Sequence, residues 1–315
     1  MGDSSIMVSA PARLHLGLVK TSEKPGTTEP RFIAAGLSLA SPKMEMEVTL
    51  RFDGSPSRDP VSRGATAVLR SLDLKGHVYT RSLTPLPIHQ GFGSGTRMAL
   101  AAAAGALRLA GKRIDILPMT RLSGRGGRSA MGAVLFAQGG VAADMEGRIL
   151  RAAAPGEWRV VLISPVVNDM MMAGIHGPAE DGIIQGIRPC SPRVRNSIED
   201  EAVAGLIGGT VNKDFVWFEN AVASIQAAAA RQFGKLQGGA ASTESGRVIL
   251  RKLRKEGIKA CGQSSWGPTL FAITATADHA KELENWLAQM PQVHKAQRVR
   301  INNSGRRLKQ DLAKA

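Results

Sequence analysis

The sequence predicts a two-domain protein of the α+β class. Its 315 residues and 43% apolar content are enough for two ordinary hydrophobic cores. Strand-like and helix-like patterns alternate along the chain without internal repeats. Small residues, proline and glycine in AAAPGEW (152–158) interrupt the pattern, and we place the domain boundary there. The expected parts are a domain at 1–155, a second at 156–300 and a solvated basic tail at 301–315.

The first half of the sequence predicts alternating strands and helices. Alternation such as MEMEVTLRF predicts strands, and apolar residues at helical spacing predict helices. The expected order is a strand at 5–18, a strand at 35–52, a helix at 60–72 and a strand at 76–83.

The next segment, IHQGFGSGTRMALAAAAGAL (88–107), places a glycine cluster at the start of a helix. Ser94 or Thr96 can serve as the N-cap, and the alanine-rich run favours helix. Such a junction presents unpaired N–H groups and the positive end of the helix dipole, which suits phosphate. The dinucleotide pattern G-x-G-x-x-G fails because Thr96 stands in the last glycine's place, and no Gly-Lys-Ser/Thr triplet occurs. The alternative is that the glycines only make a tight turn.

A second glycine-basic loop, LSGRGGRSAMGAVLFAQGG, also opens into an apolar run, and WRVVLISPV begins the second half as a strand. Later come a helix at 245–256, a glycine-rich turn and strand in GIKACGQSSWGPTLFAITAT, and a helix at 278–290. A helical stripe is expected to face the core rather than a site, and it contains Phe215, Phe218, Val222, Ile225 and Ala229.

Three separate glycine-rich loops, at 91–96, 124–129 and 262–269, therefore lie on the two halves of the chain. We predict that they form the walls of one anion site. The alternative is three unrelated turns. Arg125 and Arg128 in the second loop suit bidentate contacts with phosphate or carboxylate.

The formal net charge of +15 indicates anionic partners, which could be phosphate-bearing small molecules, nucleic acid or a membrane surface. No signal peptide or long apolar span is recognisable, so we expect a cytoplasmic location. Cys190 and Cys261 fit neither a disulfide framework nor a zinc site and are expected to be reduced structural thiols.

Four motifs carry a family resemblance. PIHQGFGSGTRMALA resembles the phosphate loop of the GHMP kinase superfamily, and CGQSSWGPTLFA resembles its C-terminal glycine motif. Together with ARLHLGL and SGRGGRSAMG…FAQGGVAAD, they resemble the beta-ribofuranosylaminobenzene 5'-phosphate synthase family over about residues 12 to 272. The resemblance implies a GHMP kinase-like fold, with an N-terminal mixed α/β domain and a ferredoxin-like C-terminal α/β sandwich.

The resemblance also implies an activity. It is the condensation of phosphoribosyl pyrophosphate with 4-aminobenzoate in tetrahydromethanopterin biosynthesis, with release of carbon dioxide and pyrophosphate. Mg²⁺ or another divalent cation is expected, ATP is not, and a homodimer is suggested. The chain has arginines where a kinase would need a carboxylate or lysine beside the acceptor. An ATP-dependent small-molecule kinase and a nucleic-acid-binding protein remain the alternatives; one tyrosine and no interleaved aromatic-basic strand argue against the latter.

Site residues follow from the motifs. His15, His89 and Trp266 have packing alternatives, and Asp144 and Glu180 have a solvated-surface alternative. The residues expected to bind substrate are Arg13, His15, His89, Gly91, Gly93, Ser94, Gly95, Thr96, Arg97, Gly124, Arg125, Gly126, Arg128, Ser129, Gln263, Ser264, Ser265 and Trp266. Asp144 and Glu180 are the candidate metal ligands. Arg97 and Gln138 depart from the family pattern, which commonly has glutamine and glutamate there.

Overall fold

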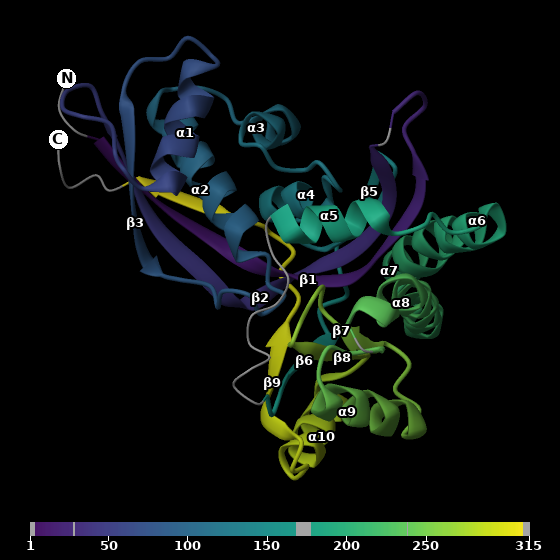
Figure 1. The fold of residues 1–315 in the computed structure, drawn as a ribbon. Coiled ribbons are helices and arrows are strands. Elements are labelled where there is room, and N and C mark those ends of the chain that lie inside the picture. The colour runs from purple at the N-terminus through teal and green to yellow at the C-terminus, as the bar shows by residue number, and fades with distance from the viewer. Residues whose placement is uncertain (1–3, 28, 168–177, 238, 311–315) are drawn as a thin grey trace.

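Two antiparallel sheets organise the chain. The computed structural model describes residues 4–27, 29–167, 178–237 and 239–310. In Figure 1 the first sheet lies in the upper part of the molecule and the second in the lower part.

The first sheet has the strand order β10-β1-β2-β4-β5, and β3 also pairs with β2. Its strands are β1 (Ser4–Glu23), β2 (Pro30–Arg51), β3 (His77–Thr84), β4 (Val141–Met145), β5 (Arg148–Ala152) and β10 (Arg307–Gln310). The helices in the same half lie between these strands in the chain, and they are α1 (Pro60–Arg70), α2 (Ser94–Leu109), α3 (Ile116–Leu122) and α4 (Met131–Gln138). Alanines on α2 are fully buried, and a Cβ on Gly105 would meet Val48 of β2 at 2.7 Å, so this helix lies very close to the sheet.

The second sheet has the order β7-β8-β6-β9. Its strands are β6 (Arg159–Pro165), β7 (Cys261–Gln263), β8 (Leu270–Thr274) and β9 (Val293–Arg300), and its helices are α9 (Glu244–Lys255) and α10 (Ala277–Ala288). Val161 and Ile163 of β6 pack with the helices in one core, while Val160 and Leu162 join the larger core shared with the first sheet. This division follows from the two-residue period of a strand.

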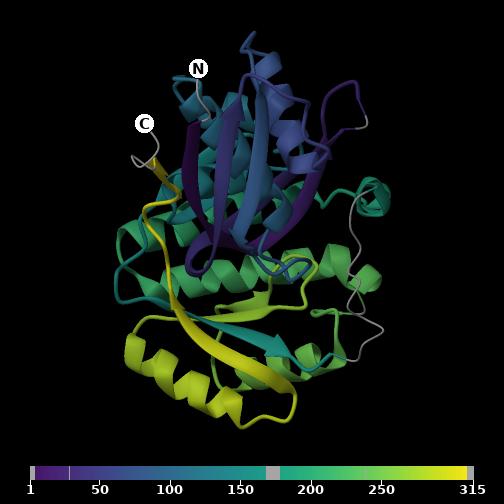
Figure 2. The same ribbon diagram turned by 90° about the vertical axis from the view of Figure 1, so that its left-hand side faces the viewer.

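A helical layer separates the two sheets (Figure 2). It contains α6 (Pro192–Asp200), the π-helix η2 (Glu201–Gly208), α7 (Gly209–Val211) and α8 (Phe215–Gln237), while α5 (Pro178–Gly186) lies to one side at the level of the first sheet. The predicted stripe of α8 packs against β1, where Gly17 leaves the space: a Cβ there would meet Ile225 Cγ2 at 2.4 Å. Trp158 closes this core against Phe218, with ring centroids 4.6 Å apart.

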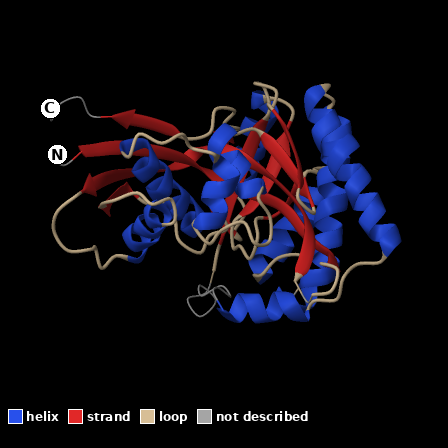
Figure 3. Cartoon of the chain, turned by 90° about the horizontal axis from the view of Figure 1, so that it is seen from above, coloured by secondary structure: helices blue, strands red, loops and turns tan. Residues whose placement is uncertain are grey.

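The C-terminal segment returns to the first sheet, which corrects the prediction of a solvated tail for its described part. After β9 the chain crosses from the lower sheet to the upper one (Figure 2) and β10 pairs with β1. Figure 3 shows the two strands side by side at the sheet edge. Asn302 fixes the crossing, because its N–H donates to Ser38 O at 2.8 Å and its carbonyl accepts from Gly140 at 2.6 Å.

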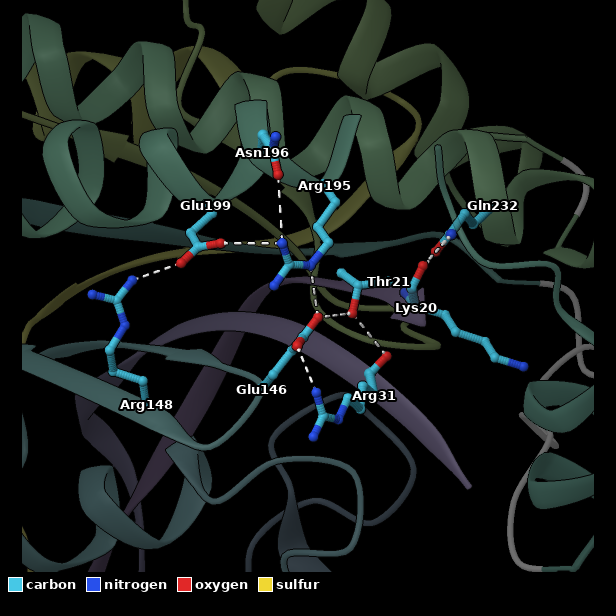
Figure 4. A network of polar contacts seen from close by, with 9 residues as sticks. All are labelled: Lys20, Thr21, Arg31, Glu146, Arg148, Arg195, Asn196, Glu199 and Gln232. Atoms are coloured by element: carbon cyan, nitrogen blue, oxygen red, sulfur yellow. Dashed lines mark hydrogen bonds and ion pairs between the residues drawn. The ribbon is translucent and has the colours of Figure 1, made fainter. Parts of the chain in front are cut away.

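Polar contacts centred on Glu146 hold the helical layer to the first sheet (Figure 4). Its carboxylate accepts from Arg195 of α6 at 2.9 Å, Thr21 of β1 at 2.7 Å and Arg31 of β2 at 3.3 Å. The hydrogen bond from Arg195 is the main reason that the pKa of Glu146 lies below its usual value. Gln232 of α8 adds a second attachment by pairing with both backbone groups of Lys20.

Replacing Glu146 with glutamine is expected to lower the free energy of unfolding at pH 7 by about 1.5–3 kcal/mol, because charge-assisted hydrogen bonds are lost. A lowered folded-state pKa means that this stabilisation is present above the unfolded-state pKa and disappears as the pH falls through the folded-state value. Denaturant titrations at pH 7 and below pH 4 measure it. Glu157→Gln, at an exposed position, is the control. A destabilisation that persists unchanged in acid would show that the charge of Glu146 is unimportant.

No helix in the described parts of the chain is long and apolar enough to cross a membrane.

Both cysteines are free, as predicted. Burial raises the pKa of Cys261 to about 11, so this thiol is unreactive at neutral pH.

Candidate active site

A cavity of about 720 Å³ lies where the three glycine-rich loops meet. Segments from both halves of the chain line it: the first half supplies β1 and two loops, and the second supplies α5, α8 and the loop after β7. The volume is that of a small-molecule site.

The first loop gives the cavity a helix N-terminus. Gly93, with φ of 70°, is the N-cap of α2, which corrects the expected cap at Ser94 or Thr96, and no side chain caps the helix. The first-turn N–H groups are therefore left for a ligand. Gly91, with φ of 82°, lies so close to the third loop that a Cβ on it would meet Ser264 O at 2.3 Å.

Irregularities in β1 present two polar side chains at the cavity. The pairing of β1 with β2 shifts register between Pro11 and Arg13 and again between His15 and Gly17, and such bulges re-aim side chains. Arg13 and His15 both line the cavity. Burial, with Arg13 and Arg128 nearby, holds the pKa of His15 well below its usual value. His15 is therefore a neutral imidazole at physiological pH and can both donate and accept hydrogen bonds.

The second loop is held in place by Asp144 of β4. Its carboxylate accepts from the Ser129 hydroxyl at 2.8 Å, Ala130 N–H at 2.7 Å and Gly147 N–H at 2.8 Å. Asp144 is buried and does not line the cavity, so it positions the loop rather than a ligand. Arg125 and Arg128 do line the cavity.

Glu180 connects the second and third loops. Its Oε1 accepts from Arg128 Nη1 at 2.5 Å and from the Trp266 indole N–H at 2.7 Å. The Trp266 ring also meets Phe233 of α8 edge-on, with centroids 5.6 Å apart. These contacts place a carboxylate, a guanidinium and an indole at the same side of the cavity.

Ser264 of the third loop lies behind the cavity wall. Its hydroxyl accepts from His15 N–H at 2.9 Å and donates to Gly91 O at 2.8 Å. It is fully buried and does not line the cavity, whereas Gln263, Ser265 and Trp266 do. The expected ligand contact of Ser264 is replaced by a bridge between β1, the first loop and the third loop.

Ser264→Ala is accordingly expected to lower the free energy of unfolding by about 1–3 kcal/mol, because two buried backbone groups lose their partner. The exposed Ser265 beside it serves as the control, and Ser265→Ala is expected to leave stability nearly unchanged. Denaturant unfolding of both variants makes the comparison. Wild-type stability in Ser264→Ala combined with lost ligand affinity would mean that the hydroxyl faces the ligand after all.

Most of the apolar wall was not predicted from the sequence as part of the site. Its lining residues are Leu18 of β1, Ile184 of α5, Ala229, Ala230 and Phe233 of α8, and Trp266 of the third loop, of which only Trp266 was predicted. Ala229 belongs to the stripe that was expected to be core only. Gln226 lies next to this wall and donates to Leu16 O at 2.7 Å. A buried glutamine within an otherwise apolar stripe was the one signal that could have marked this face of α8.

Most predicted binding residues meet at the cavity. The lining includes Arg13, His15, His89, Gly91, Gly93, Ser94, Gly95, Thr96, Gly124, Arg125, Gly126, Arg128, Ser129, Gln263, Ser265 and Trp266, together with Glu180. Arg97, Ser264 and Asp144 lie outside the lining.

The contacts of Asp144 and Glu180 do not fit a shared metal site. Asp144 already accepts three hydrogen bonds, and Glu180 is engaged by Arg128 and Trp266. Within the described residues, no group of three His, Cys, Asp or Glu side chains could hold a metal ion. The requirement for a divalent cation remains a prediction, and the described residues do not identify its ligands.

The fold is GHMP kinase-like, as predicted. The mevalonate pyrophosphate decarboxylase from Streptococcus pyogenes is similar with a TM-score of 0.72 and 14% identity, over 96% of this chain and 98% of that one. A homoserine kinase from Cytophaga hutchinsonii is similar with a TM-score of 0.66 and 14% identity, over 97% of both chains. At these identities the likeness concerns the fold alone.

Relatives found by sequence indicate the family more specifically than the solved structures do. The beta-ribofuranosylphenol 5'-phosphate synthase of Methanothermobacter thermautotrophicus is 24% identical over 303 residues, covering 85% of this chain and 88% of its own length. The enzyme of the same name from Archaeoglobus fulgidus is 24% identical over 304 residues, with the same coverage. A scan against models of protein families matches none. The relatives confirm the resemblance that the motifs predict, although their name refers to a phenol rather than an aminobenzene.

Proposed function

We propose that this protein is a decarboxylating phosphoribosyltransferase that joins phosphoribosyl pyrophosphate to 4-aminobenzoate or a closely related 4-substituted benzoate. The observation that carries the proposal is the mixed lining of the cavity. Glycine loops, an uncapped helix and arginines line it together with Phe233, Trp266 and the alanines of α8. The first group suits the phosphates of a donor, and the second suits a flat aromatic ring.

The reaction balances without an added oxidant or base. The C1–O bond of the ribose breaks as pyrophosphate leaves, and a bond forms between C1 and the ring carbon that carries the carboxylate. Loss of carbon dioxide then returns the electron pair of the broken carbon–carbon bond to the ring. Positive groups beside the leaving pyrophosphate stabilise the developing charge, and confinement in the cavity aligns the ring with C1.

Different residues of the cavity bind different groups of the substrates. First-turn N–H groups of α2 and Arg13 bind the pyrophosphate, and Arg125 and Arg128 bind the remaining anionic groups. His15, which is neutral and lines the cavity together with Arg13 and Arg128, hydrogen-bonds the ribose hydroxyls. A divalent cation, where one is used, enters with the pyrophosphate, since the described residues hold no ready-made metal site.

The name of the relatives bears on the acceptor. It refers to a ribofuranosylphenol, a product with a ring hydroxyl where the 4-aminobenzoate reaction leaves an amine. The apolar wall of this cavity favours neither group. We therefore include 4-hydroxybenzoate beside 4-aminobenzoate as acceptor, and place the reaction in tetrahydromethanopterin biosynthesis by a homodimeric enzyme.

The decisive experiment measures labelled carbon dioxide from carboxyl-labelled 4-aminobenzoate and 4-hydroxybenzoate, with and without phosphoribosyl pyrophosphate and with Mg²⁺ present or chelated. Donor-dependent release from either acid supports the proposal, and no release from both overturns it. Parallel incubations with ATP and with an oligonucleotide in graded salt test the kinase and nucleic-acid alternatives. Among the described residues that line the cavity, the one carboxylate is that of Glu180, and it is engaged by Arg128 and Trp266 rather than free to accept a proton from an acceptor hydroxyl, which disfavours a GHMP-type kinase reaction.

A further inference from the structure

Two arginines behind the first glycine loop have unpaired buried nitrogens. Arg97, in the first turn of α2, is fully buried, and its Nη1 donates to Gly132 O at 2.6 Å. Its Nε and Nη2 have no hydrogen-bond partner in the part of the chain that the structure describes, and neither has Arg13 Nη1. Buried guanidinium nitrogens are rarely left in this condition.

The side chain of Arg97 contacts an aromatic ring, which does not neutralise its positive charge. The guanidinium lies 5.8 Å from the centroid of the Phe136 ring, and Arg306 from the C-terminal segment lies 5.4 Å from the same centroid. Arg306 N–H also donates to Phe136 O at 2.7 Å. The ring therefore faces two cations and provides no negative charge.

No carboxylate among the described residues forms an ion pair with Arg13 or Arg97. Glu180 acts on Arg13 only through space, and its Oε1 is occupied by Arg128 and Trp266. Burial lowers the pKa of Arg97 to about 9, with a further contribution from Arg13, and burial likewise lowers that of Arg13 to about 10. Both groups remain charged at neutral pH, and within the described residues no ion pair neutralises either positive charge.

The two arginines differ in access to the cavity. Arg13 lines it, and Arg97 does not. A ligand anion can thus touch Arg13, while Arg97 acts on that anion only through the low-dielectric interior behind the loop.

We propose that Arg97 is a positioning residue that determines which ligand charge the site prefers. Together with Arg13, it makes the site select a multiply charged pyrophosphate group over a singly charged phosphate or carboxylate. This inference rests on the same cavity as the proposed function and specifies its anion. The positive charge costs stability in the free protein and is compensated when the anion binds.

The test compares Arg97→Gln with Arg108→Gln, an exposed arginine on the same helix. Glutamine removes the charge, and its amide can still donate towards Gly132 O. Calorimetry at constant ionic strength measures binding of inorganic pyrophosphate and of dimethyl phosphate, a singly charged probe. Thermal unfolding is measured without ligand.

For Arg97→Gln we expect pyrophosphate affinity to fall about 10-fold, dimethyl phosphate affinity to change less than about 3-fold, and the ligand-free melting temperature to rise. Arg108→Gln should change none of these. Arg97→Lys retains the charge and should retain the preference for pyrophosphate. Unchanged pyrophosphate affinity, or an equal loss for both probes, would overturn the proposal, as would an Arg97→Lys variant that behaves like Arg97→Gln.

The outcome is separable from that of the proposed function. If pyrophosphate binding depends on Arg97 but no carbon dioxide is released from either benzoate, the proposed reaction is wrong and the anion selection stands. If carbon dioxide is released and pyrophosphate affinity is independent of Arg97, only this inference is wrong.

Discussion

Gly93→Ala is expected to raise the KM for phosphoribosyl pyrophosphate by about 10- to 100-fold while the protein stays folded. Gly93 caps α2 with φ of 70°, and a Cβ there would meet Arg13 Nε at 2.7 Å and Arg13 Cγ at 3.1 Å. The colliding atoms belong to the flexible Arg13 side chain, so this side chain is expected to shift rather than the backbone of the loop. Arg13 is therefore expected to leave its place at the cavity, and the donor loses its cation.

The same helix offers a matched control at its other end. Gly111 has φ of 69°, and a Cβ there would meet nothing within 4 Å. Both alanine variants should lose about 1–2 kcal/mol of stability from the left-handed conformation, but only Gly93→Ala should lose donor affinity. Steady-state kinetics and denaturant unfolding of the two variants make the comparison. Equal KM values would show that the contact with Arg13 is irrelevant to donor binding.

Loops are the part of this site that the sequence predicts best. Glycines before an alanine-rich helix, and again beside Arg125 and Arg128, have few structural uses, and the three loops do meet at one cavity. The direction of single side chains was less predictable. Successive residues of a helix point about 100° apart, so Thr96 lines the cavity while Arg97 turns behind it.

The other wrong predictions concern residues whose positions depend on tertiary contacts. Asp144 lies in a strand whose residues are all buried, and it holds the second loop through hydrogen bonds that no local pattern indicates. Residues 307–310 were predicted to belong to a solvated tail, because their place beside β1 depends on a crossing fixed by Asn302. Small apolar residues of α8 could not be assigned to a ligand, because a helical period distinguishes buried from exposed but not core from cavity.

The apolar wall leads to the second large effect, Ala230→Leu on α8. Ala230 is partly exposed and lines the cavity beside Phe233. A leucine adds three carbon atoms where the aromatic acceptor is proposed to lie, so kcat/KM for the benzoate should fall about 100-fold by exclusion of the ring. Inorganic pyrophosphate, which we propose to bind at the glycine loops, should keep its wild-type affinity.

Ala227 on the same helix is exposed and does not line the cavity, so Ala227→Leu controls for the substitution itself. It should leave both kcat/KM and pyrophosphate binding unchanged. The two walls are then distinguished by which ligand each variant loses: Gly93→Ala affects the donor and Ala230→Leu the acceptor. Loss of both ligands in Ala230→Leu would point to a general distortion of α8, and full activity would remove the aromatic ring from this wall. Only the loss of the acceptor alone is consistent with an aromatic ring held between α8 and Trp266, from where its carboxylate-bearing carbon attacks C1 of the ribose.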